Sequence, residues 1–207
     1  MTKQIFIVRI VELYMKSVCV FSGSSPGARK SYQEVANKLG QELVKNGFSM
    51  VFGGGNVGLM GITADSVLNA GGKVVGVITE RLHDVEVAHK GLTELFIVES
   101  MHQRKKKMAE LSDSIISLPG GVGTWEEFFE ALAWNQLGIH SKPVILINTD
   151  NYYSDLFEFV KRSVEEGFLP QSSLEDFHLA QDEKEAIEII KQFRPKDTKH
   201  WYKRLER

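Results

Sequence analysis

The sequence has little of several features that mark specialised classes of protein. Its 207 residues contain one cysteine, Cys19, which excludes an internal disulfide framework and fits a reducing compartment such as the cytoplasm. No apolar run approaches the roughly 18 residues that a membrane-spanning helix needs. The net charge of −2 offers no general attraction to nucleic acid or to an anionic membrane. A site for an anion must therefore be a local feature.

Two familiar nucleotide-binding motifs are also missing. No GxGxxG follows the first apolar run, and the glycine-rich stretches lack the Lys-Ser/Thr pair of a Walker A loop. Dinucleotide binding and NTP hydrolysis therefore lose support, and a mononucleotide fits better. The six histidines do not cluster. We accordingly expect no metal site and no cofactor.

What the sequence does have is a regular alternation of two patterns. Short apolar, β-branched runs occur near 18–21, 49–52, 73–78, 95–98, 114–118 and 143–148, with a weaker one near 177–180. Amphipathic stretches occur near 29–46, 58–70, 101–112, 124–137, 154–166 and 183–193. Strands alternating with helices predict a single-domain α/β protein with a Rossmann-like, doubly wound parallel sheet.

The same patterns predict where this domain begins and ends. We expect it to span residues 15–193. Residues 1–14 are then an N-terminal extension outside the core, with a misassigned start as the alternative. Residues 194–207 are a solvated C-terminal tail, with a strand or helix that packs on a neighbouring subunit as the alternative.

Four segments directly follow predicted strands. They are 22–25 (SGSS), 53–58 (GGGNVG), 101–105 (MHQRK) and 119–124 (PGGVGT). Because ligands of an open parallel sheet bind at the carboxyl ends of its strands, we expect these segments to meet on one edge. One glycine turn can have a purely steric reason. Two such turns beside an Arg-Lys pair, with a helix N-terminus following, favour a phosphate site.

Two charged residues near these turns are candidates for chemistry. Glu127 is expected in the first turn of the helix after the second glycine loop, where the helix dipole should keep it ionised at neutral pH; the alternative is that it merely stabilises the helix. Thr124 is expected to cap that helix and to donate its hydroxyl to the phosphate. Arg104 stands in a run of four basic residues, and its place at the start of a helix favours an inward role.

At these motifs the sequence resembles the LOG (Lonely Guy) family of cytokinin-activating phosphoribohydrolases, formerly labelled lysine decarboxylases. The signature PGGxGTxxE is found at 119–127 and the companion MHxRK at 101–105, within a similarity that runs from about Val18 to about Phe193. The resemblance implies an enzyme that hydrolyses the N-glycosidic bond of a nucleoside 5′-monophosphate, such as AMP or a cytokinin riboside 5′-monophosphate. It also implies a homodimer or a larger homo-oligomer.

The resemblance assigns the catalytic pair to Arg104 and Glu127. Substrate contacts implied by the family, together with the strand-end turns, give a predicted binding set of Ser22, Gly23, Gly54, Gly55, Glu86, Lys105, Gly120, Gly121, Val122, Gly123, Thr124, Trp125 and Glu126. The chain departs from plant members at Ala133, where they have threonine, and at Val85, where they have arginine. These departures leave the preferred base open.

In the implied reaction, the Glu127 carboxylate stabilises an oxocarbenium-like ribose and orients or deprotonates the attacking water, while Arg104 positions the phosphoribosyl group. Two alternatives compete with this interpretation. A lysine decarboxylase needs a pyridoxal cofactor on a lysine Schiff base, and the sequence suggests no such site. A non-catalytic mononucleotide sensor would use the same phosphate cradle, but the presence of both Arg104 and Glu127 disfavours it.

Overall fold

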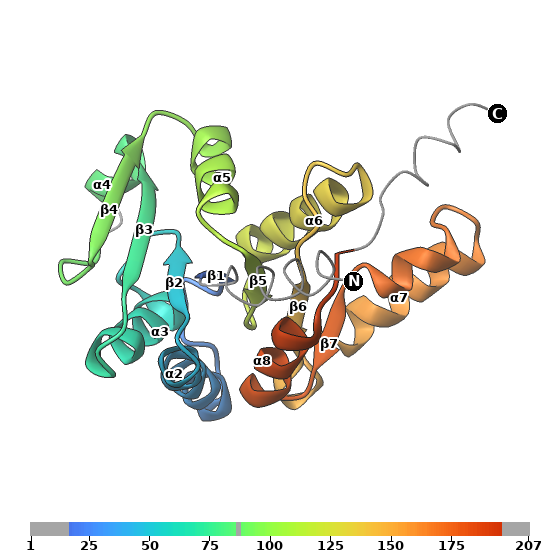
Figure 1. Ribbon diagram of the computed structural model, residues 1–207, viewed down its shortest axis with the longest axis horizontal. Helices are drawn as coiled ribbons and strands as arrows, with labels where there is room; N and C mark the ends of the chain where they lie inside the picture. Colours follow the sequence, from blue (N-terminus) through green and yellow to red (C-terminus); the bar gives the residue numbers. More distant parts are fainter. Residues whose placement is uncertain (1–16, 86–87, 196–207) are drawn as a thin grey trace, which may run out of the picture.

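Seven parallel strands form the sheet at the centre of the computed structural model (Figure 1). Residues 17–85 and 88–195 are described. The strands are β1 (Ser17–Phe21), β2 (Ser49–Phe52), β3 (Val74–Thr79), β4 (Glu94–Val98), β5 (Ser114–Ser117), β6 (Val144–Ile147) and β7 (His178–Ala180). They lie in the order β4-β3-β2-β1-β5-β6-β7, and every neighbouring pair is parallel. The predicted parallel sheet is confirmed, including its weakest strand.

Helices cover both faces of this sheet, as Figure 1 shows. One face carries α2 (Lys30–Lys45), α3 (Gly58–Asn69) and α8 (Glu183–Gln192). The other carries α5 (Met101–Glu110), α6 (Val122–Gln136) and α7 (Ser154–Glu165). The doubly wound arrangement is thereby confirmed. Three short elements were not predicted: α4 (Glu80–Val85), η1 (Thr149–Asn151) and η2 (Gln171–Glu175). They are too short to show a helical period in the sequence.

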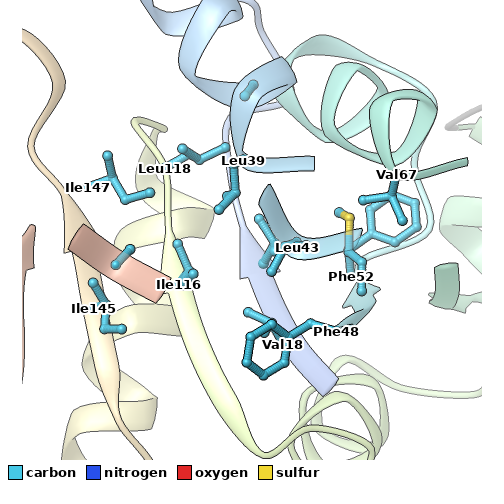
Figure 2. Close-up of a cluster of buried hydrophobic side chains, with 14 of the residues drawn as sticks. Val18, Leu39, Leu43, Phe48, Phe52, Val67, Ile116, Leu118, Ile145 and Ile147 are labelled. Atoms are coloured by element: carbon cyan, nitrogen blue, oxygen red, sulfur yellow. The ribbon is translucent and has the colours of Figure 1, made fainter. Parts of the chain in front are cut away.

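The two faces of the sheet explain its apolar runs. Side chains of a strand alternate between faces, so Val18 and Val20 of β1 enter the core under α2, whereas Cys19 and Phe21 enter the core under α6. Figure 2 shows Val18 in the core under α2, which also contains Leu39 and Leu43 of that helix. Both sides of β1 are buried from its second residue onward, which is why residues 18–21 are continuously apolar. Cys19 is fully buried, as expected of a small apolar residue.

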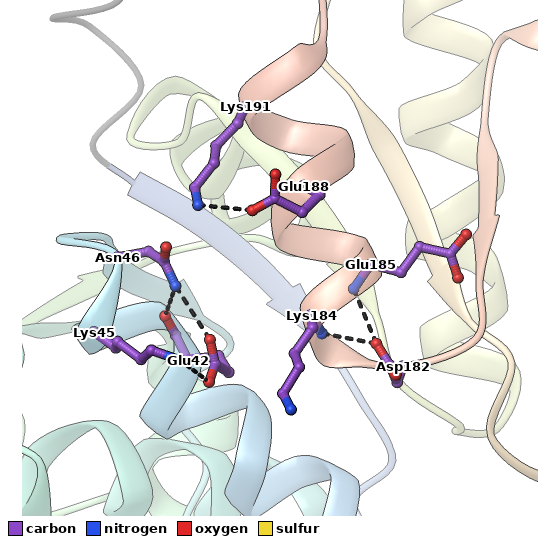
Figure 3. A network of polar contacts seen from close by, with 8 residues as sticks. All are labelled: Glu42, Lys45, Asn46, Asp182, Lys184, Glu185, Glu188 and Lys191. Atoms are coloured by element: carbon purple, nitrogen blue, oxygen red, sulfur yellow. Dashed lines mark hydrogen bonds and ion pairs between the residues drawn. The ribbon is translucent and has the colours of Figure 1, made fainter.

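Polar side chains form hydrogen bonds and ion pairs near the ends of α2 and α8 (Figure 3). Asp182 caps α8 by accepting hydrogen bonds from the backbone N–H groups of Lys184 and Glu185 at 3.0 and 2.9 Å. At the end of α2, Glu42 accepts a hydrogen bond from Lys45 Nζ at 2.8 Å, and this hydrogen bond lowers the pKa of the Glu42 carboxyl. The first contact satisfies backbone amides at the start of α8, and the second is an ion pair in the last turn of α2. Both belong to the scaffold.

The strand order places the candidate site. Going outward from β1, the chain runs to β2, β3 and β4 on one side and to β5, β6 and β7 on the other. The order therefore reverses between β1 and β5, the position at which sheets of this kind bind ligands. The predicted extension 1–14 and all but the first two residues of the predicted tail 194–207 lie outside the described residues. Within the described ranges, no helix is long and apolar enough to cross a membrane.

Candidate functional site

Three of the four strand-end segments touch one another at the reversal point. The backbone N–H of Gly23 donates to Pro119 O at 3.1 Å, and a Cβ on Gly23 would lie 3.3 Å from Gly120 Cα. Gly58 has a positive φ of 57°, and a Cβ there would lie 2.4 Å from Ser25 N. Glycine is therefore needed at Gly58 for its conformation and for the close approach of two loops. The expectation that these segments share one edge is confirmed.

Arg104 links the fourth segment to the same edge. It extends from the first turns of α5, is 6% exposed, and donates from Nε to Val77 O at 2.9 Å and from Nη2 to Gly53 O at 3.1 Å. A Cβ on Gly53 would lie 1.8 Å from Nη2, so only glycine leaves room for the guanidinium. The inward role expected for this arginine is confirmed by its burial.

Glu127 lies beside Arg104. Its Oε1 is 3.4 Å from Arg104 Nη1, and its side chain is 13% exposed. Burial raises the pKa of the Glu127 carboxyl to about 7, although the positive charge of Arg104 acts in the opposite direction. The helix dipole was expected to keep Glu127 ionised at neutral pH, but with a pKa of about 7 the acid and the carboxylate are both populated there. Helix α6 begins at Val122, so Glu127 lies beyond its first turn, where the dipole has little effect, and desolvation dominates.

The N-terminus of α6 is open to a ligand. The first hydrogen bond of the helix joins Trp125 N to Gly121 O at 3.0 Å. The amides of Val122, Gly123 and Thr124 come before this bond and therefore have no acceptor within the helix. A Cβ on Gly121 or Gly123 would meet no atom within 4 Å. These backbone groups can therefore be approached by an anion, and the helix adds a favourable dipole.

The predicted cap of α6 was wrong. The N-cap residue is Gly121, and no side chain caps the helix there. Thr124 lies inside the first turn and is 4% exposed, with its hydroxyl packed where a Cβ of Gly120 would be, 2.2 Å from Oγ1. The sequence misled because two glycines, which are weak helix formers, occupy the true start of the helix.

The other predicted binding residues have varied surroundings. Ser22 is 7% exposed, and its hydroxyl has no hydrogen-bond partner among the described residues. Gly54 O accepts a hydrogen bond from His89 N at 3.0 Å, and Gly55 forms an isolated β-bridge with Ala88. These two glycines thus fix the chain that follows α4. Glu86 falls outside the described residues.

Lys105 joins a cluster of carboxylates instead of standing free. Its Nζ contacts Glu126 and lies 2.9 Å from Glu130, both on α6. Partial burial disfavours the ammonium, but the hydrogen bonds to the two carboxylates outweigh it and raise the pKa of Lys105. Trp125 and Val122 of the same helix are exposed, at 41% and 75%.

Two tyrosines support the glycine loop and were missed by the sequence analysis. Tyr152 donates its hydroxyl to Gly120 O at 2.6 Å, and Tyr153 donates to Leu118 O at 2.7 Å. Both follow β6, next to the strand that carries the loop. The sequence holds no local signal for this contact, because it depends on the order of strands in the sheet.

A pocket lies at the ends of β3 and β4. It is lined by Thr79, Arg81, Leu82 and Met101. Within 17–85 and 88–195, no group of three or more His, Cys, Asp or Glu side chains is placed to hold a metal ion.

The chain matches known sequences over most of its length. The family described as "Possible lysine decarboxylase" matches residues 60–190. A probable cytokinin riboside 5′-monophosphate phosphoribohydrolase from Oryza sativa subsp. japonica is 46% identical over 92% of this chain and 78% of its own length. A cytokinin riboside 5′-monophosphate phosphoribohydrolase from Arabidopsis thaliana is 45% identical over 90% of this chain and 82% of its own. One from Rhodococcoides fascians is 45% identical over 85% and 89%.

Solved structures share the fold. A molybdenum cofactor binding protein from Rippkaea orientalis aligns with a TM-score of 0.66 at 25% identity, over 86% of this chain and 97% of its own. The molybdenum cofactor carrier protein of Chlamydomonas reinhardtii aligns with a TM-score of 0.65 at 21% identity, over 86% and 96%. These likenesses support the Rossmann-like architecture.

Proposed function

Because the chain belongs to the LOG family of cytokinin riboside 5′-monophosphate phosphoribohydrolases, we propose that it hydrolyses the N-glycosidic bond of a nucleoside 5′-monophosphate. The products are a free base and ribose 5-phosphate. One observation carries the proposal for this chain's own residues: a buried Arg104–Glu127 contact beside the open N-terminus of a helix. Both charged groups are where a phosphorylated sugar would meet them.

The 5′-phosphate binds at the N-terminus of α6. The amides of Val122, Gly123 and Thr124 supply donors, and the absence of Cβ atoms at Gly121 and Gly123 allows close approach. The buried, unpaired hydroxyl of Ser22 adds a donor from the end of β1. Binding of this remote phosphate orients the sugar relative to Glu127, which lowers the entropic cost of reaching the transition state.

Glu127 acts on the anomeric carbon and its attacking water. When the base leaves, positive charge develops on the ribose, and a carboxylate close to it stabilises that charge. With a pKa of about 7, Glu127 can also take a proton from the water near neutral pH. Arg104 cannot move freely, since two backbone carbonyls hold it, and it therefore fixes Glu127 and the phosphoribosyl group in one geometry.

The test is release of base measured by chromatography. We expect adenine from AMP or an N6-substituted adenine from its riboside monophosphate, and little reaction with the unphosphorylated nucleoside. Glu127→Gln should lower the rate by about 10²–10⁴, the usual range for a lost acid–base group. Glu165→Gln, an exposed change on α7, is the matched control. Nearly unchanged turnover in Glu127→Gln would remove that carboxyl from the mechanism, and AMP binding with no base release by the wild type would favour a sensor.

Lysine decarboxylation finds no support at this site. Schiff-base formation needs a neutral amine. Lys105, the lysine of the MHxRK motif, is held as an ammonium by Glu126 and Glu130.

We also propose that the chain forms at least a homodimer and works in the cytoplasm. Val122, Trp125 and Phe129 are exposed apolar residues of α6, at 75%, 41% and 39%, and their spacing of three and four places them on one side of the helix. Such a patch next to the phosphate loop is typical of an interaction surface. Light scattering of wild type and Phe129→Glu tests the assembly. The single buried Cys19 fits the reducing compartment.

A further inference from the structure

A narrow pocket lies behind Glu127, between α5, α6 and the sheet. Its lining includes Cys19 of β1, Lys105 of α5, Glu127 of α6 and His140, which follows α6. The pocket has room for a water molecule but not for a purine. We therefore do not assign it to the substrate.

The contacts of His140 determine its tautomer. Its Nδ1 lies 2.6 Å from Asn135 Oδ1, which also accepts a hydrogen bond from Lys142 N at 3.1 Å. Asn135 Nδ2 donates to Lys142 O at 2.8 Å, so the oxygen and nitrogen of this amide are identified by their partners. His140 Nδ1 is consequently the protonated nitrogen, and Nε2 carries the free lone pair.

The imidazole is also neutral over the working pH range. Burial, reinforced by the positive charge of Lys142, lowers the pKa of His140 to about 4. This is far below the value of about 7 for Glu127. His140 can therefore accept a hydrogen bond but is a poor acceptor for a proton released at Glu127.

The free lone pair has no donor among the described protein atoms. His140 Nε2 is buried and unpaired, and buried acceptors are almost always hydrogen-bonded. Nδ1 is engaged with Asn135, so Nε2 is the nitrogen of His140 that is available to a molecule in the pocket. Glu127 lines the same pocket, as do Lys105 and Glu130, so a water there has further polar residues around it.

We propose that His140 is a positioning residue: its Nε2 holds one water molecule in this pocket, and that water donates its other proton to the Glu127 carboxylate. The role in catalysis rests on the proposed function. The water hydrogen-bonds the ionised form of Glu127 and keeps its carboxylate oriented beside Arg104.

The charged and titratable groups around Glu127 set the background for this effect. They are Arg104 and Lys105 from α5, Glu126 and Glu130 from its own helix, and Cys19 from β1. Burial raises the pKa of the Cys19 thiol, so this neighbour stays uncharged. The water anchored by His140 adds one contact that favours the carboxylate over the acid.

Two substitutions separate this role from a structural one. His140→Gln places an amide oxygen near the position of Nε2 and loses the contact with Asn135. His140→Asn keeps a donor for Asn135 and loses the acceptor in the pocket. We expect His140→Asn to move the acidic limb of the kcat/KM profile up by about half a pH unit or more, which is about a threefold loss on that limb, with little change in the alkaline range. His140→Gln should keep the wild-type limb.

The proposal would be overturned if the acidic limb moved further in His140→Gln than in His140→Asn, or equally in both. His140→Gln is the variant that loses the contact with Asn135, so a larger or equal shift there would indicate a structural role. Two readouts do not need turnover. ¹³C NMR of labelled glutamate carboxyls, with the Glu127 signal assigned from Glu127→Gln, should show the same displacement in His140→Asn. ¹⁵N shifts of wild-type His140 should report a neutral Nδ1–H imidazole from pH 5 to 8, and an Nε2–H tautomer or a cation would refute the proposal. If the wild type releases no base, the proposed function fails, while these measurements still decide the role of His140.

Discussion

Replacing Glu127 with glutamine should stabilise the protein at alkaline pH while it abolishes most activity. The carboxyl titrates at its ordinary value of 4.5 in the unfolded chain and at about 7 in the folded protein. The folded state thus holds the proton more tightly. The stability contributed by this proton is complete below pH 4.5 and is lost as the pH rises to about 7.

The magnitude follows from this interval. At 1.36 kcal/mol per pH unit, ionising the buried carboxyl lowers the free energy of unfolding by roughly 3 kcal/mol at pH 8 and by roughly 1 kcal/mol at pH 5. The Glu127→Gln variant has no carboxyl at this position, so its free energy of unfolding does not fall through this ionisation. Relative to wild type, Glu127→Gln should therefore gain roughly 2–3 kcal/mol between pH 5 and pH 8. Terms that do not depend on pH cancel in this difference.

Urea unfolding of both proteins at pH 5 and pH 8, at one fixed protein concentration, measures this quantity. In thermal unfolding the same gain is about 5–10 °C for a chain of this size. Glu165→Gln, whose carboxylate remains exposed, should show a difference close to zero. A constant difference between wild type and Glu127→Gln at the two pH values would mean that burial does not perturb Glu127, and the reasoning about its proton would be refuted.

Three further predictions concern the same site. The kcat/KM for base release should rise about tenfold per pH unit below pH 7 and level off above it, since Glu127 acts as the carboxylate; a flat pH–rate profile would contradict this. Gly123→Ala should stabilise α6 by roughly 0.5–1 kcal/mol but raise the KM for AMP on the order of tenfold, because its Cβ meets no protein atom and occupies the approach of the phosphate; melting curves and initial rates check both signs. Gly53→Ala should lower kcat/KM on the order of 10²-fold, because its Cβ would displace the guanidinium of Arg104, and circular dichroism should show that the fold persists.

The sheet could be predicted from the sequence because burial on both faces leaves a local trace. The run Val144–Ile147 is apolar without interruption, and such a run between two turns has few structural alternatives to a central strand. The order of the strands places the glycine segments together, and the general rule for parallel sheets anticipated this edge. Arg104 could be identified because its helix begins at that edge.

The remaining features depend on contacts between elements far apart in the sequence. The pKa of Glu127 is set by the burial of its carboxyl and by the charge of Arg104 on another helix, which no local pattern encodes. Tyr152 reaches Gly120 only because β6 lies beside β5. The start of α6 was misplaced by two residues since Gly121 and Gly123 resemble a loop in composition, although Gly121 is the N-cap residue and Gly123 lies inside the helix.

Arg104 is held by backbone atoms, and this determines which substitutions around it can be tolerated. Its partners at Val77 and Gly53 are main-chain oxygens, which every amino acid possesses. Substitutions that alter the side chain of Val77 but preserve β3 leave the carbonyl in place. The side chains that line the pocket near Thr79 and Met101 can thus vary without removing a hydrogen-bond acceptor from the arginine.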